Sequence, residues 1–371
     1  MNQNMLFVGL DVYKEKIAVA TAEGRRSGEV RFEGTIVNKL DAVRRLVEKH
    51  ARRHGQLQFC YEAGPCGYAI YRQITRLGHD CTVVAPSLTP TRPGDRVKTD
   101  RRDAVTLARL HRAGELAAVW VPDEAHEAMR DLVRARTAAM ESQRRARQQL
   151  QGFLLRHNRI FTGGHNWTKK HRRWLTPVRF DHPAHQIVLQ DAIDAIDDAG
   201  ARRARREAQV AELLPQWSMA PVVEAIQAMR GVGFITAVTV AAETGGLRRF
   251  ESPRQLMSHL GLVPSEHALG GRTRRGGITE AGSKDTRRVL IESAWTYRTN
   301  ARIGPTHQSR LDGLPKPVRE IAWNAQVRLC SRYRRLAARG KPQTVVTTAI
   351  AREMAAFIWA IARHVQPAET V

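Results

Sequence analysis

The first third of the chain alternates between strand and helix patterns, and this order most limits what the chain can fold into. Three strand patterns come first, at residues 5–12, 16–22 and 29–37. Helix and strand patterns then follow in turn, with a helix at 40–47, a strand ending at Glu62, a helix at 67–77, a strand at 81–85, a helix after Asp100 and a last strand at 117–121. The order predicts a mixed α/β domain over residues 1–122.

Four acidic residues occupy the places in this pattern where a strand ends or a helix begins: Asp11, Glu62, Asp100 and Asp103. Asp100 and Asp103 are three residues apart at a helix start, so both point to one side of that helix. A helix cap would explain Asp100 or Asp103 alone, but caps do not explain all four positions. Converging carboxylates can hold two Mg²⁺ ions that act on a phosphodiester, so we predict a two-metal site with these four residues as ligands.

The order of three adjacent strands followed by alternating helices and strands is that of a ribonuclease-H-like (RuvC-like) α/β domain, although several α/β folds begin in the same way. The net charge of +24 makes nucleic acid the leading partner. The alternative is a basic surface that only aids solubility. Arg101 and Arg102 lie between the two helix-start aspartates, where we expect them to contact phosphates.

Neither a membrane nor an oxidising compartment is expected. We expect no apolar stretch to approach the roughly 20 residues that a spanning helix requires, and we expect no secretory signal before the first strand pattern. The four cysteines, at 60, 66, 81 and 330, lack a C-x-x-C spacing. We therefore expect neither zinc nor a disulfide framework, and we expect the cytoplasm, in association with the nucleoid.

Two long helix patterns make up the middle of the chain, at about 123–158 and 182–214, and an irregular stretch separates them. Such a pair predicts an antiparallel coiled arm, of the kind that makes oligomers or spans nucleic acid. The alternative for its arginine runs, such as residues 202–206, is a solvated helix face. An arm that makes oligomers would give a homodimer or homotetramer.

The last part of the chain begins with a helix that two glycines open, Gly231 and Gly233. Backbone N–H groups at such a helix start can face a phosphate, and a packing corner between two helices is the alternative. Further on, glycines bracket Arg272, Arg274 and Arg275 over residues 270–277, which predicts a flexible cationic loop that approaches a sugar–phosphate backbone. Three helix patterns end the chain, at 284–299, 316–338 and 344–365.

Five segments together resemble a known family. Residues 8–12, 61–64 and 98–104 resemble the acidic tetrad of the DEDD transposases of insertion-sequence-110-type elements, and residues 261–267 and 276–282 resemble the second block of that family. The resemblance spans nearly the whole chain. It implies a RuvC-like domain over 1–122, a coiled-coil arm over 123–214, and a mostly helical transposase domain over 215–371 with a helix-hairpin-helix-like segment and a serine-site loop.

The resemblance also implies partners and chemistry. A guide RNA encoded in the element, the bridge RNA, would pair with donor and target DNA and direct their recombination. A serine of the last domain would attack the phosphodiester and form a covalent link that conserves the cleaved bond. In this chain the matching stretch, residues 266–270, holds no serine, and we place Ala268 at the expected position. Either a serine was replaced by alanine there, which we favour, or the chain diverged and Ser265 or no residue is the nucleophile.

The sequence leaves three functions open. The first is an RNA-guided DNA transposase or recombinase that uses Mg²⁺ and a nucleophile at position 268. The second is a RuvC-like endonuclease that resolves branched DNA by water attack. The third is a non-catalytic nucleic-acid-binding protein with structural carboxylates.

Overall fold

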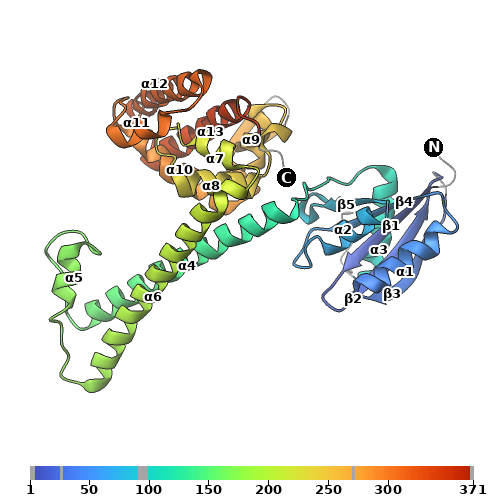
Figure 1. Cartoon of the computed structure of the whole chain (residues 1–371), viewed down its shortest axis with the longest axis horizontal. Coiled ribbons are helices and arrows are strands. Elements are labelled where there is room, and N and C mark those ends of the chain that lie inside the picture. The colour runs from blue at the N-terminus through green and yellow to red at the C-terminus, as the bar shows by residue number, and fades with distance from the viewer. Residues whose placement is uncertain (1–4, 26–27, 91–98, 270–271, 368–371) are drawn as a thin grey trace. The chain divides into compact units, whose positions relative to one another are not determined.

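The chain forms two compact units, Met1–Val121 and Pro122–Val371. The computed structural model describes residues 5–25, 28–90, 99–269 and 272–367 (Figure 1). The first unit is built on a mixed sheet and the second is mostly helical. The finer division of the second unit into an arm (123–214) and a terminal domain (215–371) stays a prediction.

The first unit contains a five-stranded sheet in the order β3-β2-β1-β4-β5. β1, β2 and β3 form an antiparallel meander, whereas β4 and β5 run parallel to β1. The strands are β1 (Met5–Val12), β2 (Lys16–Glu23), β3 (Val30–Val37), β4 (Gln56–Glu62) and β5 (Asp80–Val84). Because β1 and β4 are parallel neighbours, their carboxyl ends meet at one edge of the sheet.

The two faces of the sheet carry different side chains. Large apolar residues such as Leu10, Ile17 and Phe59 point to one face and form a core with α1 (Leu40–Ala51) and α2 (Ala69–Arg76). The other face is lined by small residues of β2 and is covered by α3 (Asp100–Ala113). The alternation of side chains along each strand thus assigns every residue to one of two layers.

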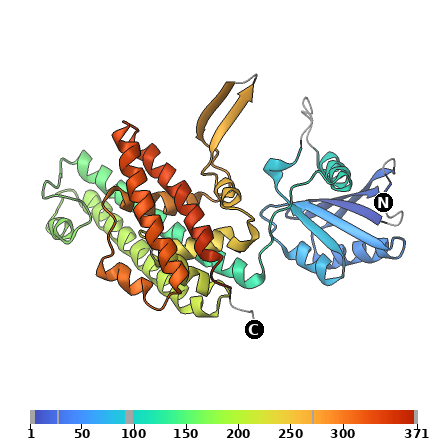
Figure 2. The same cartoon turned by 90° about the horizontal axis from the view of Figure 1, so that it is seen from above.

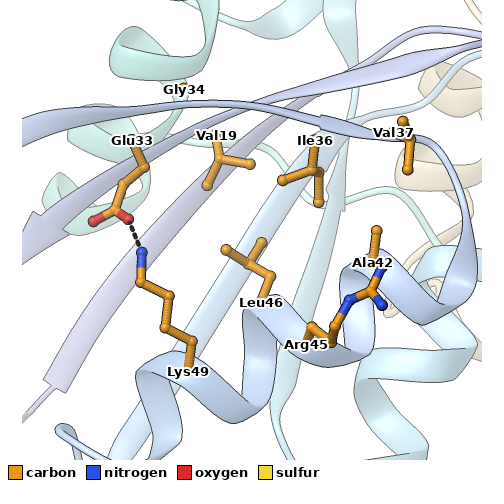
Figure 3. Close-up of a pocket in the computed structure, with 9 residues that line it drawn as sticks. All are labelled: Val19, Glu33, Gly34, Ile36, Val37, Ala42, Arg45, Leu46 and Lys49. Atoms are coloured by element: carbon orange, nitrogen blue, oxygen red, sulfur yellow. Dashed lines mark hydrogen bonds and ion pairs between the residues drawn. The ribbon is translucent and has the colours of Figure 1, made fainter.

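A pocket of about 380 Å³ opens between α1 and the β2–β3 edge (Figure 3). Apolar side chains that include Val19, Ile36 and Leu46 line it, and Glu33 and Lys49 form an ion pair of 2.8 Å at its rim. Val19 lies on the α1 face of the sheet. The pocket is therefore on the face opposite to α3.

The predicted strand at 117–121 is wrong. Ala118 forms only an isolated antiparallel bridge with Val84. The backbone makes two further hydrogen bonds to β5, from the Ala85 N–H to the Ala117 carbonyl and from the Val119 N–H to the Val83 carbonyl. Among the described residues no further ladder hydrogen bond joins this segment to β5, so it is a single bridge and not a strand.

Two long helices, α4 (Glu124–Arg156) and α6 (Pro183–Leu213), pack along each other in opposite directions (Figure 1). Their contacts include Arg136 with Glu207, and the buried Gln143, whose side chain donates to the Ile196 carbonyl at 3.3 Å and accepts from Arg203 at 3.1 Å. A polar residue that is buried and satisfied in this way sets the register of a helix pair. The short helix α5 (Lys169–Leu175) lies in the connection between them.

The remaining helices form one hydrophobic core. They are α7 (Ala220–Ile226), α8 (Phe234–Thr244), α9 (Pro253–His259), α10 (Lys284–Ala294), α11 (Pro305–Leu311), α12 (Lys316–Ala338) and α13 (Gln343–Ala362). α13 packs against α12, α10 and α9. The predicted helix at 284–299 is shorter, since α10 ends at Ala294 and the chain continues as a 3₁₀ turn, Trp295–Arg298.

α13 corrects the expectation that no apolar stretch approaches membrane-spanning length. Its 20 residues have a mean hydropathy of 1.5, which meets the length and composition of a spanning helix. Half of that stretch is buried inside the unit, and Ile350, Met354 and Ile358 belong to the core. A helix that is apolar on most sides is also what the centre of a helical domain requires, and we interpret α13 in this way.

The predicted Gly-Arg loop is also wrong for the residues that the structure describes. β6 (Pro264–Leu269) pairs with β7 (Arg272–Ile278) as an antiparallel hairpin, and Figure 2 shows this hairpin standing out from the helices. Gly270 and Gly271 lie outside the described residues. The ladder and a cross-strand ion pair of 3.1 Å between Arg275 and Glu266 compensate for the poor strand propensity of Gly276 and Gly277.

Candidate active site

Asp11 and Glu62 lie next to each other at the carboxyl edge of the sheet. In the parallel register Leu10 is opposite Tyr61, so Asp11 and Glu62 are the next pair along. Both belong to the α3 face, because side chains alternate and Cys60, two residues before Glu62, donates a hydrogen bond to the Leu107 carbonyl of α3. The two carboxylates therefore project to one side of neighbouring strands.

α3 brings Asp100 and Asp103 to the same edge. Thr99 caps the helix by accepting from the Arg102 N–H at 3.3 Å, which places both aspartates in its first turn. The helix runs antiparallel to β1, with Ala104 and Ala108 over Gly9 and His111 against Phe7 at a ring separation of 5.4 Å. Its first turn therefore lies at the level of Asp11.

Gly9 lets α3 approach the sheet, and sequence analysis did not single out this role. A Cβ atom at Gly9 would lie 2.4 Å from the Ala108 nitrogen and 2.5 Å from the Ala104 oxygen, closer than real contacts allow. Both neighbours are helix backbone and cannot turn aside. The Gly9 position, with the alanines around it, thus sets how closely Asp103 approaches Asp11.

Gly9→Ala is expected to destabilise the protein by about 1–3 kcal/mol, because the added methyl group forces α3 away from the sheet. The same shift should reduce any activity that depends on Asp103 and Asp11 together. Gly152→Ala in α4 is the matched control, since nothing lies within 4 Å of its added Cβ. Thermal unfolding of both variants checks this, and equal stability of the two proteins would contradict the packing argument.

Tyr13 and Lys16 complete the edge, and neither was predicted. Lys16 Nζ lies 2.6 Å from Asp100 Oδ2, and the Tyr13 hydroxyl donates to the same carboxylate. Burial, and then the charges of Asp11, Asp100 and Asp103, raises the pKa of Tyr13 to about 12. The hydrogen bond from Lys16 lowers the pKa of Asp100. All three aspartates thus act by charge on the same phenol at this edge of the sheet.

Glu62 is held from a different segment. Thr89 Oγ1 donates to Glu62 Oε1 at 3.2 Å and lies one residue beyond the short 3₁₀ helix Pro86–Leu88. Residues 91–98, which follow, lie outside the described residues. Thr89 orients one carboxylate oxygen of Glu62, and the second remains for other interactions.

The donor set suits a hard dication. Mg²⁺ prefers oxygen ligands and binds through one or two carboxylates together with waters. One carboxylate oxygen of Asp11 and one of Asp103 are shielded from solvent. Within the described ranges, however, no three His, Cys, Asp or Glu side chains are grouped closely enough to hold a metal ion. The chemistry of the four residues fits Mg²⁺, and their side chains would have to close around it.

The two predicted phosphate contacts beside the tetrad are exposed. The guanidinium of Arg101 lies 5.6 Å from the centre of the Phe32 ring, and the Arg102 backbone serves the helix cap. Binding of phosphates by either side chain stays a prediction.

In the second unit the structure gives Gly231 a packing role. Its φ of 82° is in the left-handed region, and a Cβ atom there would lie 2.6 Å from the Ser293 carbonyl oxygen. This favours a packing corner between helices over a phosphate-binding turn. Gly233 is the N-cap of α8 and is open apart from Arg310 at 3.9 Å. Phosphate binding at either glycine stays a prediction.

The segments of the second family block meet at the base of the hairpin. Gly261 and Gly282 both have left-handed φ values, and backbone lies within 2.3 Å of where either Cβ would stand. The buried Arg287 donates to the Leu260 and Gly282 carbonyls at 3.3 and 3.1 Å. These contacts anchor both strands, so the base of the hairpin is rigidly held.

Position 268 lies on β6, where Ala268 is opposite Thr273. It is thus in a strand and not in a loop as predicted. Ser265 lies nearer the base, where a Cβ atom on Gly276 would be 2.5 Å from its hydroxyl oxygen. Arg274 and Arg275 are exposed on the opposite strand, Arg275 being paired with Glu266.

Comparison with known proteins agrees with this architecture. Residues 8–158 match a family model described as a DEDD-type transposase, and residues 223–308 match the "Transposase IS116/IS110/IS902 family". The chain belongs to this family of transposases.

Individual relatives support the assignment. The chain is 55% identical over 358 residues to "Putative transposase y4qE" of Sinorhizobium fredii, which covers 96% of this chain and 88% of that protein. It is 28% identical over 335 residues to the transposase for insertion sequence element IS1533 of Leptospira borgpetersenii. That alignment covers 89% of this chain and 96% of the relative. It is 25% identical over 262 residues to the transposase for insertion sequence element IS1328 of Yersinia enterocolitica. That alignment covers 68% of this chain and 77% of the relative.

Proposed function

We propose that this chain is an RNA-guided DNA transposase or recombinase that acts with Mg²⁺ in the cytoplasm. The observation that carries the proposal is the placement of Asp11 and Glu62 at neighbouring parallel strand ends, with Asp100 and Asp103 in the first turn of α3 at the level of Asp11. A ribonuclease-H-like sheet presents carboxylates at this edge, and the family assignment places the chain among DNA-processing enzymes.

Each residue has a role in this proposal. Asp11, Glu62, Asp100 and Asp103 would hold Mg²⁺, which when bound stabilises charge on the scissile phosphate and its leaving oxygen. Lys16 and Tyr13 hold Asp100, and Thr89 holds Glu62, at this edge of the sheet, from which the side chains would close around the metal. A serine at position 268 would attack phosphorus and expel the 3′ or 5′ oxygen, and reversal on a second strand would complete the exchange.

The partners follow from the same proposal. An element-encoded guide RNA would pair with donor and target DNA, and a homodimer or homotetramer would bring position 268 of one subunit to an acidic site. Arg101, Arg102, Arg272, Arg274 and Arg275 would contact phosphates. A water-attacking nuclease remains the second candidate, because the acidic edge alone is sufficient for it.

Cleavage of DNA that contains the element ends tests the proposal. The chain as given and its Ala268→Ser variant are incubated with Mg²⁺ or with EDTA, each with and without element-derived RNA. Cleavage by the variant that requires both Mg²⁺ and RNA supports the proposal. Cleavage by both proteins without RNA would instead identify a water-attacking nuclease, and binding without cleavage throughout would identify a non-catalytic binding protein.

A further inference from the structure

A long stretch of the arm is rich in basic residues and has no acidic residue of its own. Residues 142–180 contain ten lysines and arginines and no aspartate or glutamate. The stretch covers the second half of α4, the connection and α5. Figure 1 shows that α5 lies at the end of the arm away from the helices that form the core. We call residues 153–189 the distal end of the arm.

The distal end is a packed structure and not a solvated loop. His171 and Leu175 of α5 are buried, and the His171 ring contacts those of Phe161, Trp167 and Trp174 at 5.0 to 5.6 Å. The aromatic rings are engaged by the arm's own arginines as well, since Arg147 lies 5.0 Å from the Trp167 ring. These rings therefore anchor the distal end from inside.

The opposite side of α5 is cationic. Lys169, Lys170, Arg172 and Arg173 are all exposed, and at 100° per residue they face away from His171 and Leu175. Among the described residues only Arg172 of these four forms an ion pair, with Asp197 at 2.6 Å. Three cations on one face of one helix thus lack a counter-charge.

A groove with both polar and apolar walls, of about 590 Å³, continues this face toward α6. Arg172, Arg173 and Arg179 line it with Thr176, and α6 contributes Gln186, Gln190, the apolar Leu189 and Ile193, and Asp197, the partner of Arg172. Guanidinium, hydroxyl and amide groups are the donors that protein surfaces present to phosphate oxygens. The groove and the outer face of α5 together form one surface on which cations outnumber acids.

We propose that the distal end of the arm binds the phosphate backbone of duplex DNA, separately from the acidic edge and the hairpin. The proposal rests on the proposed function in so far as the substrate is DNA. Duplex is favoured over unpaired bases because the rings are turned inward, and single strands are bound mainly by rings on which bases stack. Contacts of this kind hold the DNA without reading its sequence.

The surface is tested by Lys169→Gln, Lys170→Gln and Arg173→Gln together, none of which has an internal ion pair among the described residues. We expect duplex binding to weaken about tenfold or more at physiological salt. The slope of log affinity against log salt should fall by about 2.7, because each lost phosphate contact contributes about 0.9. The matched control combines Arg335→Gln, Arg339→Gln and Lys341→Gln. These three exposed cations lie in the last turn of α12 and just after it.

A second variant tests the surface by adding a phosphate contact. Thr176→Lys adds one cation at the groove, and the slope should rise by about 0.9. An unchanged slope in both arm variants would overturn the proposal, as would an equal loss in the control triple. Loss of binding to hairpin RNA with duplex binding intact would also overturn it, because the partner would then be RNA.

The proposed function and the proposed DNA-binding surface of the arm can fail independently of each other. The arm triple retains all four carboxylates, and Asp11→Asn retains the whole arm. If Asp11→Asn leaves cleavage intact while the arm triple weakens DNA binding, the acidic site is wrong and the arm surface stands. If the arm triple binds normally while Asp11→Asn abolishes cleavage, the reverse holds.

Discussion

Asp11→Asn is expected to lower DNA strand cleavage on the order of a thousandfold, measured in the Ala268→Ser background. Asparagine keeps the size of the side chain but removes the charge that would hold Mg²⁺, and metal stabilisation of a transition state contributes several kcal/mol. At about 1.4 kcal/mol for each factor of ten, this gives the stated loss. Asp103→Asn should behave in the same way, because the first turn of α3 lies at the level of Asp11.

Nucleic-acid binding should remain nearly unchanged in both variants, since the basic surface is intact. Asp41→Asn in α1 is the control, because Asp41 is exposed and pairs only locally with Arg44. Gel analysis of cleaved DNA and filter binding on the same samples separate the two effects. Full cleavage by Asp11→Asn would remove the acidic site from the mechanism.

Ala268→Ser is expected to create a covalent protein–DNA species that survives denaturation, whereas the chain as given should bind DNA without exchanging strands. Alanine has no oxygen with which to attack phosphorus, and serine supplies one. The position lies on a hairpin strand whose base is held by Arg287. One added hydroxyl should change the free energy of unfolding by no more than about 0.5 kcal/mol.

Leu269→Ser is the matched control for this substitution, because it places the hydroxyl one residue further along β6. A serine at 269 is displaced by one residue, about 3.3 Å along the strand, from the expected position, so it should form no adduct. An adduct with Leu269→Ser but not with Ala268→Ser would shift the nucleophile position by one residue. An adduct with the unmodified chain, lost in Ser265→Ala, would identify Ser265 as the nucleophile.

Sequence periodicity predicted most elements of the first unit because the pattern is local. β1 at 5–12 has the predicted bounds, and α12 has those predicted at 316–338. The prediction was wrong where pairing between distant segments decides the outcome. Glycines and arginines at 270–277 have low strand propensity, and only the ladder with β6 makes the described part of that stretch a strand.

The candidate site shows the same division. The four carboxylates could be named from the sequence because each stands where a strand ends or a helix begins. Lys16 and Tyr13 could not be named in this way. A tyrosine in a turn and a lysine at the start of a strand carry no signal of a carboxylate partner 84 or more residues away. The contact of Gly9 with α3 was equally invisible, because it depends on the approach of a helix more than 90 residues further along the chain.

By itself, the sequence determined most of the order of strands and helices in the first unit, the places of the acidic residues and the family, because these depend on neighbours along the chain. Tertiary structure alone decided that small residues let α3 lie on β1, that Asp100 pairs with Lys16, and that the apolar α13 is half buried in a helical core. The physical reason is that close packing and ion pairing join residues through space, and their free energies depend on burial that no local pattern encodes.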